Sequence, residues 1–204
     1  MAVVDKPSAR EAKRLQTRER LMGAAIAEFK RAGMADADVG AIVAAAGVAH
    51  GTFFFHFPTK QHVLLELERR EEERIAKQLG RFADGKHTLR EILEEAVRLV
   101  LGLERRLGAL LFKDFLALHF STTRPPSEEW TSHPVIVAVV EELRRAQARG
   151  QIPPGVDVML NGVSFLVGLY ALLITMPESW EIRRPVIDVY LTTYLHGLRA
   201  LDRE

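Results

Sequence analysis

Hydrophobic residues recur at helical spacing along most of the chain, and the strict alternation typical of strands is nearly absent. A first helix is predicted from about Ala9 to Ala32, with Gly33 as its C-terminal stop. Its buried face consists of Leu21, Met22, Ala25 and Phe29. This pattern predicts an all-α protein.

Two short helices follow the first one. Asp38 is placed to cap a helix over Val39–Ala46, and Gly47 can adopt the left-handed backbone of a tight turn. A second short helix, about Ala49–Phe57, ends at Pro58. A helix, a tight turn and a helix in this order are typical of a helix-turn-helix.

The second short helix is rich in phenylalanine. Phe53 and Phe57 are one turn apart and share a face, so we expect them to anchor the helix in the core. The other side carries Gly51, Thr52, Phe55 and His56, and Phe54 borders the buried face. Outward aromatic rings indicate a surface that another molecule covers. In a helix-turn-helix the second helix enters the major groove, so DNA is the predicted occupant.

The rest of the chain predicts longer helices. One runs from Thr59 to about Phe82, and we interpret its charged run Glu68–Arg74 as a solvated face. Others are expected from the capping box Thr88–Glu91, from Pro134 to about Arg149, over Val158–Met176 and, after a loop at Pro177–Arg184, from Pro185 to about Leu201. About nine helices result. We expect a DNA-binding domain at 9–60, with its helix-turn-helix at about 38–57, joined by the long helix to a bundle at 61–204.

Composition excludes several classes of protein. The 204 residues include no cysteine, so disulfides and thiolate chemistry are excluded. The first residues form no apolar stretch like that of a secretory signal, and we expect a cytoplasmic protein. Residues 1–60 carry nine Lys/Arg and six Asp/Glu, an excess that suits a surface meeting phosphates, although on charge alone a solvated helix is the favoured interpretation.

One predicted helix has the length of a membrane span. Val158–Met176 contains no charged residue over 19 positions. Its two glycines and the polar Asn161 and Ser164 favour a helix buried in a core or subunit interface instead. We therefore expect no membrane association.

The N-terminal third resembles the TetR-type transcriptional regulators. The resemblance covers Thr17–Leu67 and rests on a first helix ending in Phe29 and Gly33, on Ile-Val-Ala-Ala-Ala-Gly-Val at 42–48, and on Gly-Thr-Phe-Phe-Phe-His-Phe-Pro-Thr-Lys at 51–60. It implies a DNA-contact set of Ala49, His50, Gly51, Thr52, Phe54, Phe55, His56 and Lys60. Ala49 replaces a frequent Ser or Thr, so the second short helix lacks a side-chain N-cap.

Nothing in the C-terminal part is typical of catalysis. His87, His119, His133 and His196 are isolated along the sequence, so we expect no metal site, no cofactor and no enzymatic activity. The resemblance implies a pocket for a small apolar ligand. Its predicted lining is Phe112, Phe115, His119, Met159, Asn161, Phe165 and Tyr170.

These observations predict a ligand-responsive repressor that a small apolar inducer releases from a palindromic DNA operator. A homodimer is expected through the last two long helices, with Leu166, Leu169, Leu173 and Met176 as the stripe of the first, and with Gly162 and Gly168 permitting close helix approach. The alternative is a helical small-molecule binding protein or enzyme whose helix-turn-helix does not bind DNA.

Overall fold

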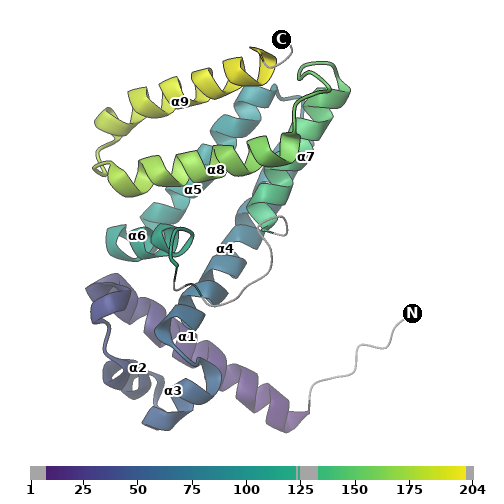
Figure 1. Ribbon diagram of the computed structural model, residues 1–204. Coiled ribbons are helices and arrows are strands. Elements are labelled where there is room, and N and C mark those ends of the chain that lie inside the picture. Colours follow the sequence, from purple (N-terminus) through teal and green to yellow (C-terminus); the bar gives the residue numbers. More distant parts are fainter. Residues whose placement is uncertain (1–7, 123, 125–132, 201–204) are drawn as a thin grey trace.

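The computed structural model describes residues 8–122, 124 and 133–200, which contain helices and no strand (Figure 1). The described helices are α1 (Ala9–Asp36), α2 (Val39–Ala46), α3 (His50–His56), α4 (Lys60–Ala83), α5 (Leu89–Leu107), α6 (Ala109–Leu118), α7 (Pro134–Ala148), α8 (Val158–Thr175) and α9 (Trp180–Ala200). Figure 1 shows α1–α3 as a small unit at one end, from which α4 leads into the larger bundle. The predicted all-α class and the order of its parts are confirmed.

The helix boundaries follow the capping residues of the sequence. Asp38 accepts hydrogen bonds from the backbone N–H groups of Gly40 and Ala41 at the start of α2. Gly47 ends α2 in the left-handed conformation, with φ 62°. Gly33 also has a positive φ, 78°, so the regular part of α1 ends where the sequence predicts. At Thr88 both hydrogen bonds of the capping box form.

The small unit is held on the bundle by α4 and by polar contacts to α5 and α6. The carboxylate of Asp114, on α6, accepts a hydrogen bond of 2.6 Å from the backbone N–H of Met34. The ammonium group of Lys30 donates to the carbonyl of Arg106, at the end of α5, at 2.6 Å. One continuous hydrophobic core runs through both parts. A displacement within the bundle therefore changes the position of α1 as well as that of α4.

The last helix begins earlier than the sequence predicts. We expected a loop at Pro177–Arg184 and a helix start at Pro185, but α9 begins at Trp180 and Pro185 lies inside it. The carbonyl of Ser179 accepts hydrogen bonds from the N–H groups of Ile182 and Arg183, which closes the first turn. Pro185 has no backbone N–H, so the helix lacks one hydrogen bond close to its N-terminal end. The predicted end at Leu201 lies outside the described residues.

Taken singly, α8 is the one described helix that is long and apolar enough to cross a membrane. Buried helices of other proteins pass the same test, and α8 packs on both its neighbours. A Cβ atom at Gly162 would lie 2.5 Å from Val140 on α7, and one at Gly168 would lie 2.6 Å from the hydroxyl of Tyr190 on α9. The two glycines thus permit close packing, as predicted, but within one subunit.

Candidate nucleic-acid interface and a buried polar cluster

The axes of α2 and α3 are bent by 95° from one another across the turn at Gly47. This angle lies in the range of helix-turn-helix units. Phe53 and Phe57 are fully buried and hold α3 on the core, as predicted. Ala49 provides no side-chain hydrogen bond to the start of α3, also as predicted. The seven-residue α3 is therefore held mainly by its buried rings.

Part of the predicted DNA-contact set is exposed on the outer side of α3. Phe55 is 74% exposed, and Phe54 is also exposed, with its ring edge-on to that of Phe53. Ala49, His50 and Gly51 are exposed at the start of the helix, and Thr52 is half-buried. These residues form a continuous apolar and polar surface on the second helix of the motif.

The predicted outward orientation of His56 is wrong. Its side chain is only 9% exposed, and it lines a cavity together with Arg18 on α1 and His62 on α4. The backbone carbonyl of His56 accepts a hydrogen bond from the guanidinium of Arg18, on α1. Burial, aided by the charges of Arg18 and Arg14, lowers the pKa of the His56 imidazole. His56 is therefore positioned as a packing residue in this conformation.

Lys60 is engaged within the small unit. Its ammonium group donates hydrogen bonds to the carbonyls of Ala35, at 2.7 Å, and Ala37, at 3.1 Å. A cation at these carbonyls stabilises the C-terminal end of α1. The phosphate contact predicted for Lys60 stays a prediction, and making it requires exchanging these two bonds.

Sequence reasoning missed two arginines that brace the motif. The Arg20 guanidinium donates to the carbonyls of Ala46 and Gly47, which lie at the end of α2 and in the turn. The Arg18 guanidinium lies 4.1 Å from the centre of the Phe57 ring and 3.6 Å from a carboxylate oxygen of Glu66. In the sequence both arginines were only part of a basic excess. No local pattern marks a cation that reaches carbonyls 26 residues away.

The residues predicted to line a ligand pocket do not together line any of the four best-defined cavities among the described residues. Phe112, Phe115 and Phe165 are packed in the core. The amide of Asn161 donates to the carbonyl of Asp157. Of the four best-defined cavities among the described residues, only the smallest, about 10 Å³, is lined by His119 and Tyr170, and none of these four is lined by the other five predicted residues. Their role in ligand binding stays a prediction.

Two larger cavities lie elsewhere. One of about 470 Å³ lies between α5 and α9, with Arg98, Arg183 and Ile187 among its lining residues. Another of about 330 Å³ lies between the small unit and the bundle, where His56, Glu68 and His133 contribute to its wall. This second cavity is mainly lined by charged and polar residues, unlike the apolar pocket predicted.

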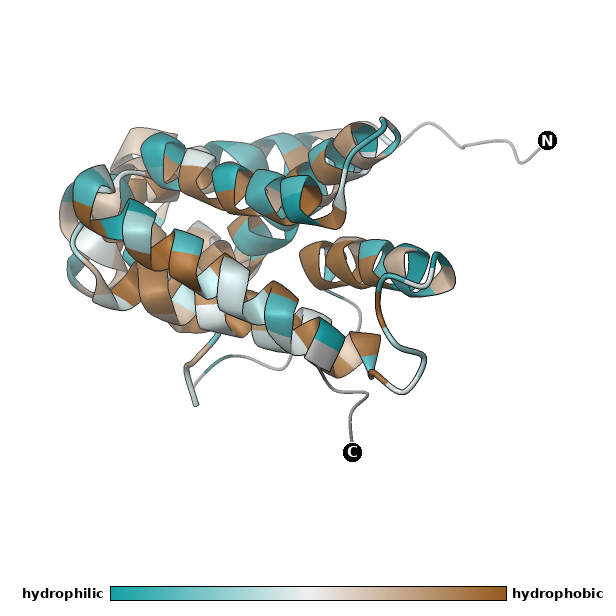
Figure 2. Ribbon diagram, turned by 90° about the horizontal axis from the view of Figure 1, so that it is seen from above, coloured by the Kyte–Doolittle hydropathy of each residue, from teal (hydrophilic) through white to brown (hydrophobic). Residues whose placement is uncertain are grey.

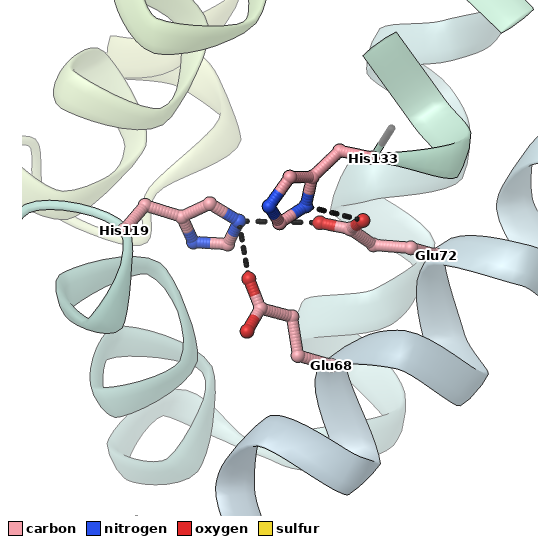
Figure 3. Close-up of side chains that lie close together, drawn as sticks. All are labelled: Glu68, Glu72, His119 and His133. Atoms are coloured by element: carbon pink, nitrogen blue, oxygen red, sulfur yellow. Dashed lines mark hydrogen bonds and ion pairs between the residues drawn. The ribbon is translucent and has the colours of Figure 1, made fainter. Parts of the chain in front are cut away.

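A buried polar cluster adjoins the second cavity. It consists of Glu68 and Glu72 on α4, His119 directly after α6 and His133 directly before α7, and we call it the Glu/His cluster (Figure 3). Nε2 of His119 lies 2.8 Å from a Glu68 oxygen and 3.2 Å from a Glu72 oxygen. Nδ1 of His133 lies 3.0 Å from the other Glu72 oxygen. The expectation that His119 and His133 are isolated is therefore wrong in space.

Charge stabilises the Glu/His cluster despite its burial. Glu68 is 2% and Glu72 is 3% exposed, so the prediction of a solvated face is wrong for both. Burial opposes ionisation of Glu72, but hydrogen bonds with His119 and His133 outweigh burial and lower its pKa. Burial likewise opposes protonation of His119, yet hydrogen bonds with Glu68 and Glu72 raise its pKa to about 9. Nη1 of Arg124 also lies 3.0 Å from Glu68.

The family model of the bacterial regulatory proteins of the tetR family matches residues 21–67. This segment contains most of α1, the whole helix-turn-helix and the start of α4. The N-terminal unit is similar to that of the TetR family. The resemblance found in the sequence is thus confirmed, and TetR-family regulators bind DNA through this motif.

Solved structures extend the likeness to the TetR-type fold of the whole chain. FadR of Thermus thermophilus, a TetR-family transcriptional repressor in complex with lauroyl-CoA, is 21% identical with a TM-score of 0.68, over 92% of this chain and 96% of that one. RolR in complex with resorcinol is 17% identical with a TM-score of 0.68, over 92% of this chain and 89% of that one. At such identities the likeness concerns the fold. No curated protein matches the chain significantly.

Glu72, His119 and His133 lie outside the TetR-family match, and Glu68 follows its last residue directly. The match therefore accounts for the helix-turn-helix and leaves the cluster without a role. The TetR-type regulators are transcription factors rather than enzymes, and the fold agrees with that class.

Proposed function

We propose that the chain is a cytoplasmic, homodimeric transcriptional repressor that binds a palindromic operator through α3 and is released by a small molecule bound in its C-terminal domain. The observation that carries the proposal is the outward Phe55 and Phe54 on a helix-turn-helix of the TetR family. Apolar rings at this position fit sugars and thymine methyl groups in the major groove. A helical binding protein or enzyme that does not bind DNA has no use for such a surface.

The DNA-binding part can be tested without knowing the operator. Repeated selection of bound duplexes from a random pool should enrich one palindrome whose half-sites lie about one helical turn apart. Affinity for this site should fall steeply between about 50 and 200 mM salt, because phosphate contacts release counterions. Failure to enrich any sequence, together with equal binding to all duplexes, would contradict a sequence-specific regulator.

The dimer is proposed through the outer face of α8 and α9. The stripe predicted from the sequence lies mostly in the subunit's own core, since Leu166, Leu169 and Leu173 are buried. A different stripe is open: Leu160 on α8 is 64% exposed and Val189 on α9 is 65% exposed. Figure 2 shows hydrophobic residues recurring along the helix that leads to the C-terminus. A second copy of the chain would cover this apolar surface.

Val189→Glu should convert the dimer to a monomer, because the twofold arrangement would bury unpaired carboxylates at the interface. Light scattering at micromolar concentration should give twice the chain mass of 22.9 kDa for the unmodified protein and that single mass for the variant. Val137→Glu is the matched control, since Val137 is an exposed valine on α7. A Val189→Glu protein that stays dimeric would place the interface elsewhere.

An inducer is the remaining part of the proposal. Similar structures hold lauroyl-CoA in one case and resorcinol in another, which supports a small molecule with an apolar part as the ligand class. Ligand binding can lower operator affinity by no more than the ratio of the ligand's affinities for two arrangements of the bundle. Since α4 joins the bundle to α3, a change in its tilt would alter the separation of the two recognition helices.

A further inference from the structure

The Glu/His cluster brings two carboxylates and two imidazoles together from three separate elements. Glu68 and Glu72 are four residues apart, so they project from the same face of α4. His119 and His133 reach them from the end of α6 and from the start of α7. One potential ligand atom from each residue lies within 4.8 Å of the other three (Figure 3).

We propose that the Glu/His cluster is a binding site for one divalent transition-metal ion, with Zn²⁺ as its best match. Ligands at about 2.0 Å from a tetrahedral Zn²⁺ are about 3.3 Å from one another. The contacts between the imidazole nitrogens and the carboxylate oxygens measure 2.8, 3.0 and 3.2 Å. Small shifts of these four side chains would therefore open a tetrahedral site.

The orientation of His119 supports the proposal independently of these distances. Its Nδ1 lies 3.2 Å from the carbonyl oxygen of Phe115, a partner that can only accept a hydrogen bond. With Nδ1 donating to this carbonyl, Nε2 is the nitrogen that faces Glu68 and Glu72, and an ion that displaces the Nε2 proton would meet the lone pair there. Metal-binding histidines are usually fixed by such a bond from their second nitrogen. The Tyr170 ring, edge-on at 4.9 Å between ring centres, restrains the imidazole further.

The donor set and the charge select the kind of ion. Two imidazoles favour a transition ion over Mg²⁺ or Ca²⁺, which prefer sites made entirely of oxygen. A divalent ion balances the two buried carboxylates of Glu68 and Glu72. Arg124 also pairs with Glu68, through one carboxylate oxygen. This oxygen is Oε1, which also lies 2.8 Å from Nε2 of His119, so an ion in the site would bind Oε2 of Glu68 or share Oε1 with the arginine.

The site has a path to solvent. The cavity of about 330 Å³ has Glu68, Glu72 and His133 in its wall. Its other lining residues include Arg18 on α1 and His56, the last residue of α3. An ion can therefore enter without unfolding of the bundle. Once bound, it would join α4 to α6 and α7 and so stabilise the folded chain.

The experiment uses the full chain, dialysed against a chelator and titrated calorimetrically with ZnCl₂. One ion should bind per chain, and the melting temperature should rise with Zn²⁺ concentration. Glu72→Gln and His119→Gln should each weaken binding by about 100-fold or more, since each removes a ligand. Added Mg²⁺ or Ca²⁺ should not compete. Co²⁺ bound in place of Zn²⁺ should give the intense visible absorption of a tetrahedral complex.

The matched control is the double variant Glu73→Gln/His196→Gln. It removes one carboxylate of α4 and one imidazole, both exposed, and should bind Zn²⁺ like the unmodified protein. Circular dichroism checks folding; if Glu72→Gln does not fold, His133→Gln at the cavity wall takes its place. Absence of saturable Zn²⁺ binding, or equal Zn²⁺ affinity in cluster and control variants, would overturn the proposal. The Glu/His cluster would then be a network of buried ion pairs that binds no metal. None of these measurements involves DNA, so the result is independent of operator binding.

Discussion

Phe55→Asp should lower operator affinity by about 100-fold or more while leaving the fold intact. The side chain of Phe55 is 74% exposed on α3, so its replacement removes little from the core. On DNA the same position would lose an apolar contact to a sugar or a thymine methyl group. It would also bring a carboxylate close to the phosphates, where Coulomb repulsion adds to the loss. Binding titrations on the selected operator measure the effect.

Phe120→Asp is the matched control for this experiment. It makes the same exchange at a phenylalanine of 45% exposure that follows α6, in the bundle rather than in the helix-turn-helix. Both variants should melt close to the unmodified protein, and only Phe55→Asp should fail to bind. Equal operator affinity of Phe55→Asp and the unmodified chain would remove α3 from the proposed interface. An equal loss in both variants would point to a general effect of added negative charge.

The sequence predicts the helix-turn-helix well because its determinants are local. Asp38 and Gly47 define the ends of α2 through their own backbone conformations. Phe53 and Phe57 are separated by one turn, and this spacing alone assigns them to the same buried face. His56 shows the limit of such reasoning. Periodicity places it away from that face, but in the folded protein its side chain is buried, because the burial of a residue at the end of a seven-residue helix depends on tertiary contacts.

The Glu/His cluster could not be predicted, because its members are distant in sequence. Glu68 and Glu72 belong to a run of charged residues whose other members do form surface ion pairs, such as Arg69 with Glu73. Only tertiary contacts, namely the packing of α7 on α4 and the approach of His119 after α6, distinguish the two buried carboxylates from the exposed ones. His119 and His133 have no local pairing either. A ligand set drawn from three elements requires tertiary structure to be seen.

A further large effect is expected at Glu104, whose role also depends on tertiary contacts. Arg183, on α9, is 1% exposed, and its Nη1 lies 2.6 Å from a carboxylate oxygen of Glu104 on α5. The other terminal nitrogen, Nη2, donates to the carbonyls of Leu173 and Met176 at the end of α8. The arginine thus ties together the three helices that support the proposed dimer face.

Glu104→Ala should lower the free energy of unfolding by about 3–5 kcal/mol, because it leaves the Arg183 guanidinium buried without its counter-charge. Urea denaturation followed by circular dichroism measures the change. Glu94→Ala is the control on the same helix. Glu94 pairs with Arg90 at the surface, and exposed pairs contribute at most about 1 kcal/mol. Similar losses of unfolding free energy in the two variants would show that the buried pair of Arg183 and Glu104 contributes no more to stability than an exposed pair.

The double variant Glu104→Leu/Arg183→Met separates the cost of an unpaired charge from the value of the pair. Glu104 and Arg183 each keep one buried side-chain atom without a hydrogen-bond partner among the described residues, so the pair is imperfectly satisfied. Replacing both with apolar side chains removes the desolvation of two charges together with their attraction. The double variant should therefore be more stable than Glu104→Ala. If it is less stable, the bonds from Arg183 to the carbonyls that end α8 contribute more than the ion pair itself.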